Sequence, residues 1–423
     1  MTTAQILSIV IFVVALGLII SEKVHRALVA ILGGSLLIVL HVITFDQAMG
    51  HLDFNTLGVL LGMMMFVSVV KLSGIFEFLA VKCAHIAQGD PWRLMMLFAI
   101  LTACLSALLD NVTTVLLIGP MTLTMCKLLD LDPVPFFIVE ILSSNIGGTA
   151  TMIGDPPNIM IGSAAGFSFF DFIMVDAPAV VIIMVAILVV FYFIYGRKMV
   201  VSAGQRAAIM EMDPTSYIKK PRLLKMSVVV TIIVMAGFML HGFLHIESCI
   251  IALGAAAILL LISGENIEAA LHDVEWTTLA FFAGLFMIVG AMTETGVIGI
   301  VANWLIEITH GEMFMAMMVL LFGSALISAF LDNIPFVATM IPILLAMEGS
   351  GMDVTPLWWA VSLGACLGGN GSLIGASANV VLSDVSKKAG YEITFIHFLK
   401  VGFPIMCLTV VIAAVYMFFR FPM

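Results

Sequence analysis

The sequence predicts an all-α polytopic membrane protein, an inverted repeat of two five-span halves, each with a re-entrant helical hairpin and a broken helix. Hydrophobic residues make up 62% of the chain and charged residues only 10%, whereas a soluble globular chain is usually about a quarter charged. A polar, glycine-rich pair of segments also occurs twice, about half a chain apart. Interrupted hydrophobic segments at matching positions of two halves are typical of secondary transporters, whose binding sites lie where such segments meet.

The two copies correspond motif by motif. The first copy reads LDNVTTVLLIGP followed by SSNIGGTATMIGDPPN, and the second reads LDNIPFVATMIP followed by LGGNGSLIGASAN, so that Asp110 corresponds to Asp332. The similarity extends over almost the whole chain. We therefore expect a first repeat over 1–196, a linker over 197–225 and a second repeat over 226–423.

The first half opens with plain spans and continues with interrupted ones. Apolar stretches long enough to cross about 30 Å of hydrocarbon begin near Ile6, His25 and Thr56, and a last one covers 177–195. The run 94–129 is too long for one span and is cut by a carboxylate, which predicts a re-entrant hairpin with its tip inside the protein. The run 135–162 contains adjacent glycines and a Pro-Pro pair, which predict a broken helix.

The second half repeats this order. Plain spans begin near Ser227, Ser248 and Thr277, and a last span begins near Val401. Between them we expect a hairpin at about 313–347 and a broken helix at about 356–382.

The distribution of basic residues predicts the orientation. Lysine and arginine are concentrated in the linker 197–225, and such an excess marks the cytoplasmic side of short loops. We expect the protein in the plasma (inner) membrane, with the linker cytoplasmic and both termini outside. Because each half crosses the membrane an odd number of times, the second half begins on the opposite side of the membrane from the first and has the inverted orientation. No Lys or Arg lies between Lys225 and Lys387, which supports this inversion.

Two carboxylates stand at the predicted hairpin tips, Asp110 and Asp332. An ionisable side chain inside a bilayer costs at least about 2.5 kcal/mol on insertion scales, so such residues are usually functional. Asp is also a good N-cap residue, and capping of the second hairpin arm is the purely structural alternative. The two roles are compatible, because a helix N-terminus offers free N–H groups while nearby unwound carbonyls suit a cation.

The broken helices supply amide, hydroxyl and bare backbone groups, which suit a small oxyanion, a neutral trihydroxide or a hard cation. Packing of small residues between helices explains the glycines, but not the neighbouring Asn and Thr. Asp155 breaks the pseudo-symmetry, because Ala376 stands at the matching position, and an unpaired intramembrane carboxylate is a natural carrier of a proton or cation. The candidate substrate- or ion-binding residues are therefore Asp110, Thr113, Asn145, Gly147, Gly148, Thr149, Thr151, Asp155, Asp332, Gly368, Gly369, Asn370 and Ser372.

Other chemistries have little support in the sequence. The six cysteines are scattered without metal-ligand or disulfide spacing, and we expect no metal site and no cofactor beyond a coupling H⁺ or Na⁺. Cys104 and Cys366 are the thiols expected nearest the site, where they either pack or contact a soft metalloid. The broken segments lack a nucleophile and base pair, which disfavours an enzyme. No basic aromatic-rich segment suggests nucleic acid binding.

The repeated motifs resemble those of the ArsB/NhaD permeases of the ion transporter superfamily, in particular the branch of arsenite permeases and the melanosomal P permease. The resemblance covers nearly the whole chain. It implies a scaffold and a mobile transport unit, elevator-like alternating access, a homodimer and, for an arsenite permease, a cytoplasmic ATPase subunit. Carried over onto this sequence, it adds Asn111, Asn158, Asn333, Ser377 and Asn379 to the site.

The substrate hypothesis rests on this resemblance and on charge. No Lys, Arg or His occurs within the motif regions, which counts against large di- and tricarboxylates. The Ser-Asn-Thr signatures of related dicarboxylate carriers are replaced by Ser144-Asn145-Ile146 and Gly369-Asn370-Gly371. The leading hypothesis is proton-coupled efflux of arsenite or antimonite. The alternatives are a Na⁺/H⁺ antiporter of the NhaD type, an anion (carboxylate or chloride) transporter, and a channel or membrane scaffold.

Overall fold

The computed structural model describes residues 1–21 and 23–422, and the regular structure of this part of the chain is entirely helical. The first half contains α1 (Thr3–Ser21), α2 (Arg26–Val39), α3 (Phe45–Gly50), α4 (Phe54–Lys71), α5 (Ile75–Ile86), α6 (Pro91–Ser106), α7 (Asn111–Leu129), α8 (Val134–Thr149), α9 (Pro156–Ala165) and α10 (Phe169–Ile194). The linker contains η1 (Gly196–Lys198), α11 (Ala203–Met210) and η2 (Pro214–Tyr217).

The second half has the same order of helices. It contains α12 (Pro221–Leu244), α13 (Ser248–Ser263), α14 (Ile267–His272), α15 (Trp276–Glu294), α16 (Val297–Ile308), α17 (Met313–Ser328), α18 (Asn333–Gly349), α19 (Thr355–Gly368), α20 (Ser377–Lys388) and α21 (Phe395–Arg420). Among the described residues, seven helices are long and apolar enough to cross a membrane, or eight if α16 and α17, bent by 118°, form one span. The chain is therefore a polytopic membrane protein, as its composition predicts.

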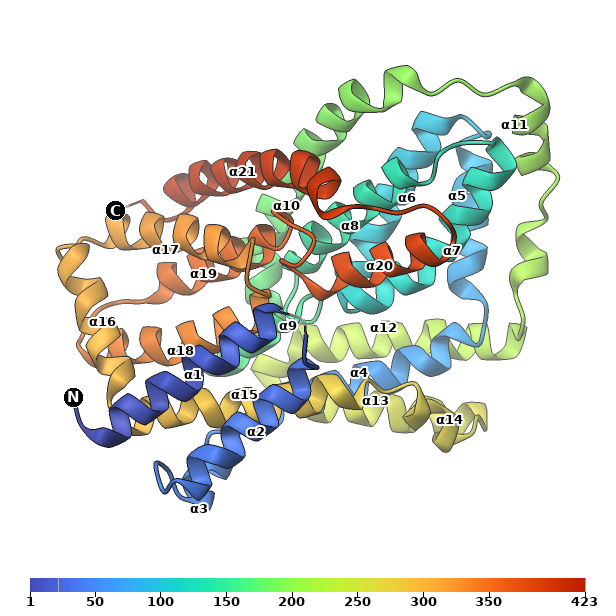
Figure 1. Cartoon of the computed structure of the whole chain (residues 1–423). Helices are drawn as coiled ribbons and strands as arrows, with labels where there is room; N and C mark the ends of the chain where they lie inside the picture. Colours follow the sequence, from blue (N-terminus) through green and yellow to red (C-terminus); the bar gives the residue numbers. More distant parts are fainter. Residues whose placement is uncertain (22, 423) are drawn as a thin grey trace.

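One hairpin and one broken helix form the centre of each half. α6 and α7 make the first hairpin and α17 and α18 the second, and Figure 1 shows the two hairpins entering from opposite ends of the molecule. Asp110 caps α7 by accepting a hydrogen bond from the N–H of Thr113, and Asp332 caps α18 by accepting one from Ile334. α8 and α9, like α19 and α20, are the two parts of a broken helix. This arrangement confirms the predicted fold class.

The plain spans of the two halves pack in crossed pairs, α4 on α13 and α2 on α15. Gly62 of α4 lies so close to the backbone of Ala252 and Leu253 that a Cβ atom would collide with it, at 2.5 and 2.6 Å. Such close approach of small residues is the usual way for helices to associate in a membrane. In the second pair, Gly33 and Gly34 of α2 pack against Ile288 and Met287 of α15.

Two helices that the sequence analysis did not predict connect the plain spans to the hairpins. α5 follows Gly74 and α16 follows Gly296, at φ values of +82° and +77°. This left-handed conformation suits glycine, which has no Cβ to clash. The two matching turns redirect the chain and start a separate helix inside a stretch that reads as continuously apolar.

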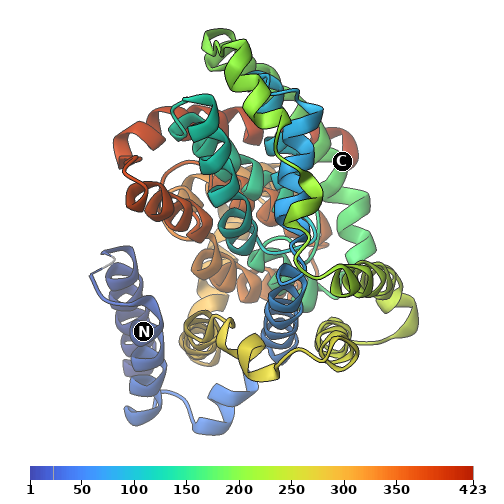
Figure 2. The ribbon, with the colours of Figure 1, turned by 90° about the vertical axis from the view of Figure 1, so that its right-hand side faces the viewer.

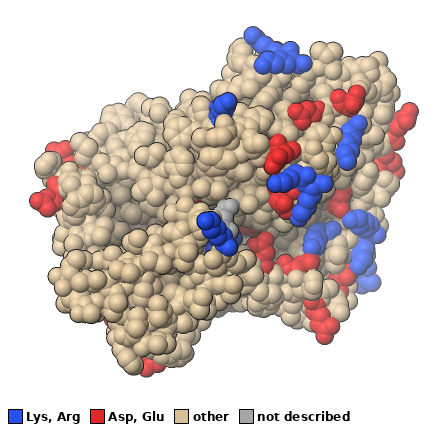
Figure 3. Space-filling view, in the orientation of Figure 1, with Lys and Arg blue, Asp and Glu red and all other residues tan. Residues whose placement is uncertain are grey.

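The ends of the molecule differ in charge. The linker, α11 and α14 lie at one end, while both termini and α16 lie at the other (Figure 1). On the face drawn in Figure 3, Lys and Arg gather towards the linker end, whereas the few charged side chains visible at the opposite end are acidic. Figure 2, which looks onto the linker end, shows α1 and α2 at one edge of the helix bundle. The termini and the linker thus lie at opposite ends, as an odd number of crossings in each half requires.

Candidate functional site

A single buried carboxylate connects the two hairpins. Asp155 is fully buried at the end of the first break. Its Oδ1 accepts a hydrogen bond from Nδ2 of Asn111 at 3.3 Å, and its two oxygens accept from Nδ2 of Asn333 at 3.3 and 3.1 Å. Asn111 and Asn333 are the first residues of α7 and α18. Pseudo-symmetric amides from the two halves therefore meet at Asp155, whose matching position in the second half is Ala376.

A second group of amides forms hydrogen bonds between the two halves. Nδ2 of Asn145 donates to Oδ1 of Asn370 and Oδ1 of Asn379, both at 2.9 Å, and its Oδ1 accepts from Nδ2 of Asn111 at 3.2 Å. All four side chains are buried. The structure thus brings the asparagines of both breaks and the first hairpin into one connected network.

Two asparagines hold the breaks in place. Nδ2 of Asn158 donates to the carbonyls of Thr149 and Thr151, both at 3.1 Å. Nδ2 of Asn379 donates to the carbonyls of Gly369 and Ser372, at 2.7 and 2.9 Å. Where a helix stops inside a membrane, its free carbonyls must find donors within the protein. The two amides therefore stabilise the breaks and need not contact a solute.

The hydroxyls of the site mostly bond to nearby backbone. Thr149 donates to the carbonyl of Asn145, and Thr151 donates to the carbonyl of Ala107 in the first hairpin. Ser372 donates to the carbonyl of Ala329 in the second hairpin, and Thr113 donates to the carboxylate of Asp110. The hydroxyls of Thr151 and Ser372 thus fasten the broken helices to the hairpins, whereas those of Thr149 and Thr113 bond within their own helix or cap. Asn111, Asn333 and Asp155 line the central cavity.

The paired glycines let the broken helices approach the hairpins. A Cβ on Gly147 would collide with the backbone of Ala103, and one on Gly148 would lie 2.6 Å from the carbonyl oxygen of Gly154. Gly368 packs in the same way on Ala325 of α17, and a Cβ on Gly369 would lie 3.1 Å from that of Ala376. These four glycines therefore act through packing.

We expect Gly368→Ala to destabilise the protein by about 1 to 3 kcal/mol, the usual range for overpacking. The new Cβ would lie 2.6 Å from the carbonyl oxygen and 2.7 Å from the Cα of Ala325, which are backbone atoms that cannot rotate away. Gly323→Ala on α17 is the matched control, because no atom lies within 4 Å of its Cβ position; it should gain up to about 1 kcal/mol. Thermal unfolding of the purified variants measures both, and equal unfolding temperatures would contradict the packing role.

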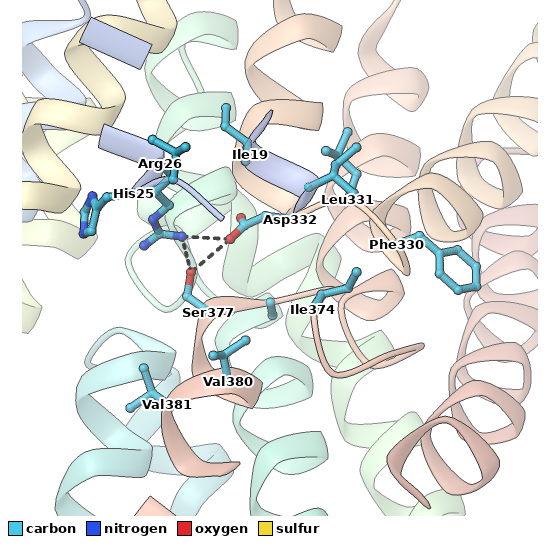
Figure 4. Close-up of a pocket in the computed structure, with 13 residues that line it drawn as sticks. Ile19, His25, Arg26, Phe330, Leu331, Asp332, Ile374, Ser377, Val380 and Val381 are labelled. Carbon is cyan, nitrogen blue, oxygen red and sulfur yellow. Dashed lines mark hydrogen bonds and ion pairs between the residues drawn. The ribbon is translucent and has the colours of Figure 1, made fainter. Parts of the chain in front are cut away.

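Arg26, at the start of α2, reaches the second hairpin. Its Nη1 donates to Oδ2 of Asp332 at 2.9 Å and to Oγ of Ser377 at 2.7 Å, and Ser377 also donates to Asp332 at 3.0 Å (Figure 4). The motif regions themselves contain no Lys, Arg or His, but the fold brings this basic side chain to the tip of the second hairpin. Arg26 lies far from the motifs along the chain, in a position that reads as a cytoplasmic loop charge, so no sequence signal connects it to the site.

Two cavities meet at Arg26. The central cavity has a volume of about 20 Å³, and the vestibule, which is the wider cavity of Figure 4, has a volume of about 270 Å³. Both volumes are the space that the centre of a water molecule can reach. Arg26 and Ser377 line both. The vestibule is otherwise mainly apolar, with lining from the end of α1, the second hairpin tip and α20. The cluster of Arg26, Asp332 and Ser377 therefore separates an open vestibule from a nearly closed centre.

The central cavity is acidic. Its charged lining consists of Asp110, Asp155 and Glu275 against the single guanidinium of Arg26, which is already paired with Asp332. Burial in a medium of low dielectric strengthens the attraction of such a site for positive charge. The lining therefore suits a proton, a metal cation or a neutral polar solute better than a multivalent anion.

The two thiols that the sequence placed nearest the site differ. Cys366 is buried, and its Sγ lies 3.5 Å from Oδ1 of Asn158. Cys104 is exposed on α6 and is not among the residues that line the central cavity. Within the described part of the chain, no group of three or more His, Cys, Asp or Glu side chains has the arrangement of a metal site.

Comparison with known proteins agrees with this architecture. The family model described as CitMHS, citrate transporter, matches residues 16–364. The uncharacterized transporter Rv2684 of Mycobacterium tuberculosis is 40% identical over 99% of this chain and 99% of its own length. The P protein of Mus musculus is 33% identical over 95% of this chain, which spans 58% of that longer protein.

A solved structure shares the fold. The crystal structure of the Alcanivorax borkumensis YdaH transporter aligns over 98% of both chains with a TM-score of 0.59 and 14% sequence identity. The fold, the family match and the relatives agree that this protein is a membrane transporter rather than an enzyme, and the chain belongs to the CitMHS citrate transporter family.

Proposed function

We propose that this protein is a secondary active transporter of a small inorganic solute with little or no negative charge, and that it exports arsenite and antimonite, as neutral trihydroxides, in exchange for protons. The observation that carries the proposal is the acidic, amide-rich lining of the central cavity, with Asp155 at the point where both hairpins meet. A neutral solute is bound by amides and hydroxyls without a compensating positive charge.

The charge of the central cavity argues against citrate, although citrate gives the family its description. A trivalent anion would meet three carboxyl groups and one guanidinium. Citrate, another carboxylate or chloride would have to draw Arg26 away from Asp332. These anions are therefore weaker candidates than a neutral trihydroxide.

The motifs support the arsenite permease branch. LDNVTTVLLIGP and GGTATMIGDPPN resemble the ArsB/NhaD permeases, and the relatives include the P protein of Mus musculus, in line with that resemblance. The buried thiol of Cys366 beside Asn158 offers a soft ligand to a trivalent metalloid. Asp155 is the proposed carrier of the coupling proton, because it is the one site acid without a symmetry mate.

Alternating access follows from the two hairpins. In our proposal, α6 to α9 and α17 to α20 move together as the transport unit, relative to the crossed pairs α4 with α13 and α2 with α15. Arg26 belongs to this scaffold, whereas Asp332 and Ser377 belong to the moving unit, so their contact must break when the unit moves. The cluster is then one closed state of an elevator-like cycle.

Na⁺/H⁺ antiport is the second candidate, and the same lining favours it. Carboxylate and amide oxygens are the ligands that hard cations prefer, and Asp110, Asp155 and Asn111 bring both kinds to the central cavity. In this alternative, Asp155 binds Na⁺ and protons in competition, and no metalloid is carried.

Proteoliposomes with purified protein test the proposal. We expect uptake of arsenite and antimonite that saturates and that rises when an opposing proton gradient is imposed. Parallel arms with Na⁺, Li⁺, citrate and chloride decide between the candidates. Na⁺-dependent proton movement without metalloid flux supports the antiporter, saturable citrate uptake supports the family description, and flux that does not saturate indicates a channel. Any of these three outcomes overturns the arsenite proposal.

The partners and orientation are part of the proposal. We infer a plasma (inner) membrane protein with a cytoplasmic linker and both termini outside, because Lys and Arg gather at the linker end. The resemblance adds a homodimer and, for an arsenite permease, a cytoplasmic ATPase subunit. Since Gly33 and Gly34 are covered by α15, the dimer would use another surface of the scaffold.

A further inference from the structure

A second buried carboxylate lies outside the repeated motifs, on α10. Asp176 is fully buried, and its Oδ2 lies 2.7 Å from Oγ of Ser362 on α19. Its Oδ1 is buried and has no hydrogen-bond partner among the described residues. None of the ion pairs in the described part of the chain includes it. A buried ionised carboxylate without a positive partner carries a large desolvation cost.

The same serine also contacts the first break. Oγ of Ser362 lies 2.8 Å from Oδ1 of Asn158. The orientation of the Asn158 amide is fixed, because its Nδ2 donates to the carbonyls of Thr149 and Thr151. Its Oδ1 can therefore only accept a hydrogen bond. A serine hydroxyl has a single hydrogen to donate, so it cannot donate to Asp176 and Asn158 at once.

The two short contacts of Ser362 need two hydrogens, and its hydroxyl supplies only one. If Asp176 is protonated, its O–H donates to Oγ of Ser362, and Ser362 donates to Asn158, so each short contact contains one hydrogen. If Asp176 is ionised, one of the two contacts joins a pair of oxygens with no hydrogen between them. The thiol of Cys366, 3.5 Å from the Asn158 oxygen, is only a weak donor and leaves the 2.8 Å contact unexplained.

We propose that Asp176 is a proton-binding site that is coupled to the transport site through Ser362 and Asn158. In the conformation described here Asp176 holds a proton. When its O–H bond breaks, the proton leaves to water, the Ser362 hydroxyl turns to the new carboxylate, and Asn158 loses its donor. Asn158 is then less firmly held on the carbonyls of the break that ends at Asp155. This inference deepens the proposed proton coupling and rests on it.

The groups around Asp176 leave this site without a counter-charge. Cys366 on α19 lies near both Asp176 and Asp155. α21 contributes Tyr416, whose hydroxyl donates to the carbonyl of Val175 at 2.6 Å, with Arg420 beyond it. None of these described neighbours is a cation in contact with the Asp176 carboxyl.

The remaining helices against α10 place their charged groups elsewhere. α12 brings His241 to the first turn of α10, where its Nε2 accepts from the N–H of Phe169 at 3.1 Å. α8 carries Glu140, which accepts from Thr122 on α7. α6 and η1 meet the far end of α10, where Trp92 and Arg197 contact Tyr192.

Infrared spectroscopy of the purified full-length protein tests the proton directly. We expect wild type to show the carbonyl band of a buried protonated carboxyl, and Asp176→Asn to lose one such band. Glu307→Gln, which changes an exposed carboxyl on α16, is the matched control and should leave the spectrum unchanged. Ser362→Ala keeps Asp176 but removes its hydrogen-bond partner, so the band should persist at a shifted frequency. A carbonyl region identical in wild type and Asp176→Asn overturns the proposal.

The pH dependence of unfolding gives an independent readout. Because the folded state holds a proton on Asp176 that the unfolded chain releases at neutral pH, this group makes stability fall as pH rises. The side-chain amide introduced by Asp176→Asn would donate to Ser362 at every pH, so the unfolding temperature of this variant should fall less than that of wild type between about pH 5 and about pH 8. Equal slopes contradict the inference. If Asp176→Asn does not fold, the infrared spectrum of Ser362→Ala decides: a shifted carboxyl band supports the proposal, and an unshifted carbonyl region overturns it.

Transport separates this inference from the proposed function. In proteoliposomes, Asp176→Asn should retain solute exchange while its net flux no longer responds to a proton gradient. If wild type carries no arsenite or antimonite, the proposed function fails, whereas the infrared and unfolding results still decide whether Asp176 holds a proton. If Asp176→Asn loses its band but keeps full gradient dependence, the coupling role of Asp176 is wrong.

Discussion

Asp155→Asn is expected to reduce ion-coupled transport at least tenfold while the protein still folds. The substitution keeps the shape of the side chain but removes the charge that would pair with a coupling proton or cation. It also places an NH₂ group opposite Asn111 or Asn333, both of which donate to Asp155 through Nδ2. A tenfold loss corresponds to about 1.4 kcal/mol, and a hydrogen bond to a charged group contributes about 1.5 to 3 kcal/mol.

The measurement is gradient-driven flux of the solute that wild type carries, in proteoliposomes with equal amounts of protein. Asp46→Asn, at an exposed acid on α3, provides the control for loss of one negative charge and should match wild type. Exchange of solute across the membrane without a gradient separates coupling from binding. If Asp155→Asn keeps wild-type dependence on the gradient, the coupling ion binds elsewhere, and Asp155 only fastens the two hairpins together.

The sequence predicts the parts of this site that are repeated. The two LDN motifs mark hairpin tips because a carboxylate interrupts an apolar run, and the Gly-Gly pairs mark breaks because glycine is a poor helix former that allows close packing. Matching amides in the two halves then have matching tasks, as Asn158 and Asn379 do on the carbonyls of their breaks. Duplication therefore identifies both the elements and their central residues.

The unrepeated polar residues are harder to predict. Arg26 and Asp176 have no motif around them, and only tertiary packing brings Arg26 to Asp332 and Asp176 to Ser362. Glu140 lies in an apolar run that predicts only a span, yet it is buried with one oxygen bonded to Thr122 and the other without a partner among the described residues. Position along one helix does not reveal which neighbouring helix a polar side chain faces.

The role of each repeated group also depends on packing. Thr149, Thr151 and Ser372 are hydroxyl-bearing residues in polar breaks, which is the composition expected of ligands. In the fold, each hydroxyl donates to a backbone carbonyl. Residue type therefore predicts that a hydroxyl group is able to bind an ion. Whether the hydroxyl instead bonds to a backbone carbonyl depends on the unpaired carbonyls that the fold places beside it.

Arg26→Gln is expected to uncouple transport with little loss of stability. The side chains of Arg26 and Asp332 are 28% and 13% exposed, and Asp332 keeps its hydrogen bonds from Ser377 and from the N–H of Ile334 in this variant. The unfolding temperature should therefore change little. The pair nevertheless stands between the vestibule and the central cavity, so its loss should allow the solute to leak down its gradient and should lower gradient-driven accumulation roughly tenfold, or about 1.4 kcal/mol.

A double-variant cycle separates this contact from a general effect of charge. Asp332→Asn retains a good N-cap for α18 but removes the charge that Arg26 pairs with. The double variant Arg26→Gln with Asp332→Asn should therefore lose less gradient-driven accumulation than the sum of the losses of the two single variants. Residues in direct contact usually show interaction energies of about 0.5 to 3 kcal/mol. Lys23→Gln, in the same connection between α1 and α2, is the control and should transport normally. Strictly additive effects on leak and accumulation would mean that Arg26 acts through the vestibule alone, with no closing contact to the moving hairpin.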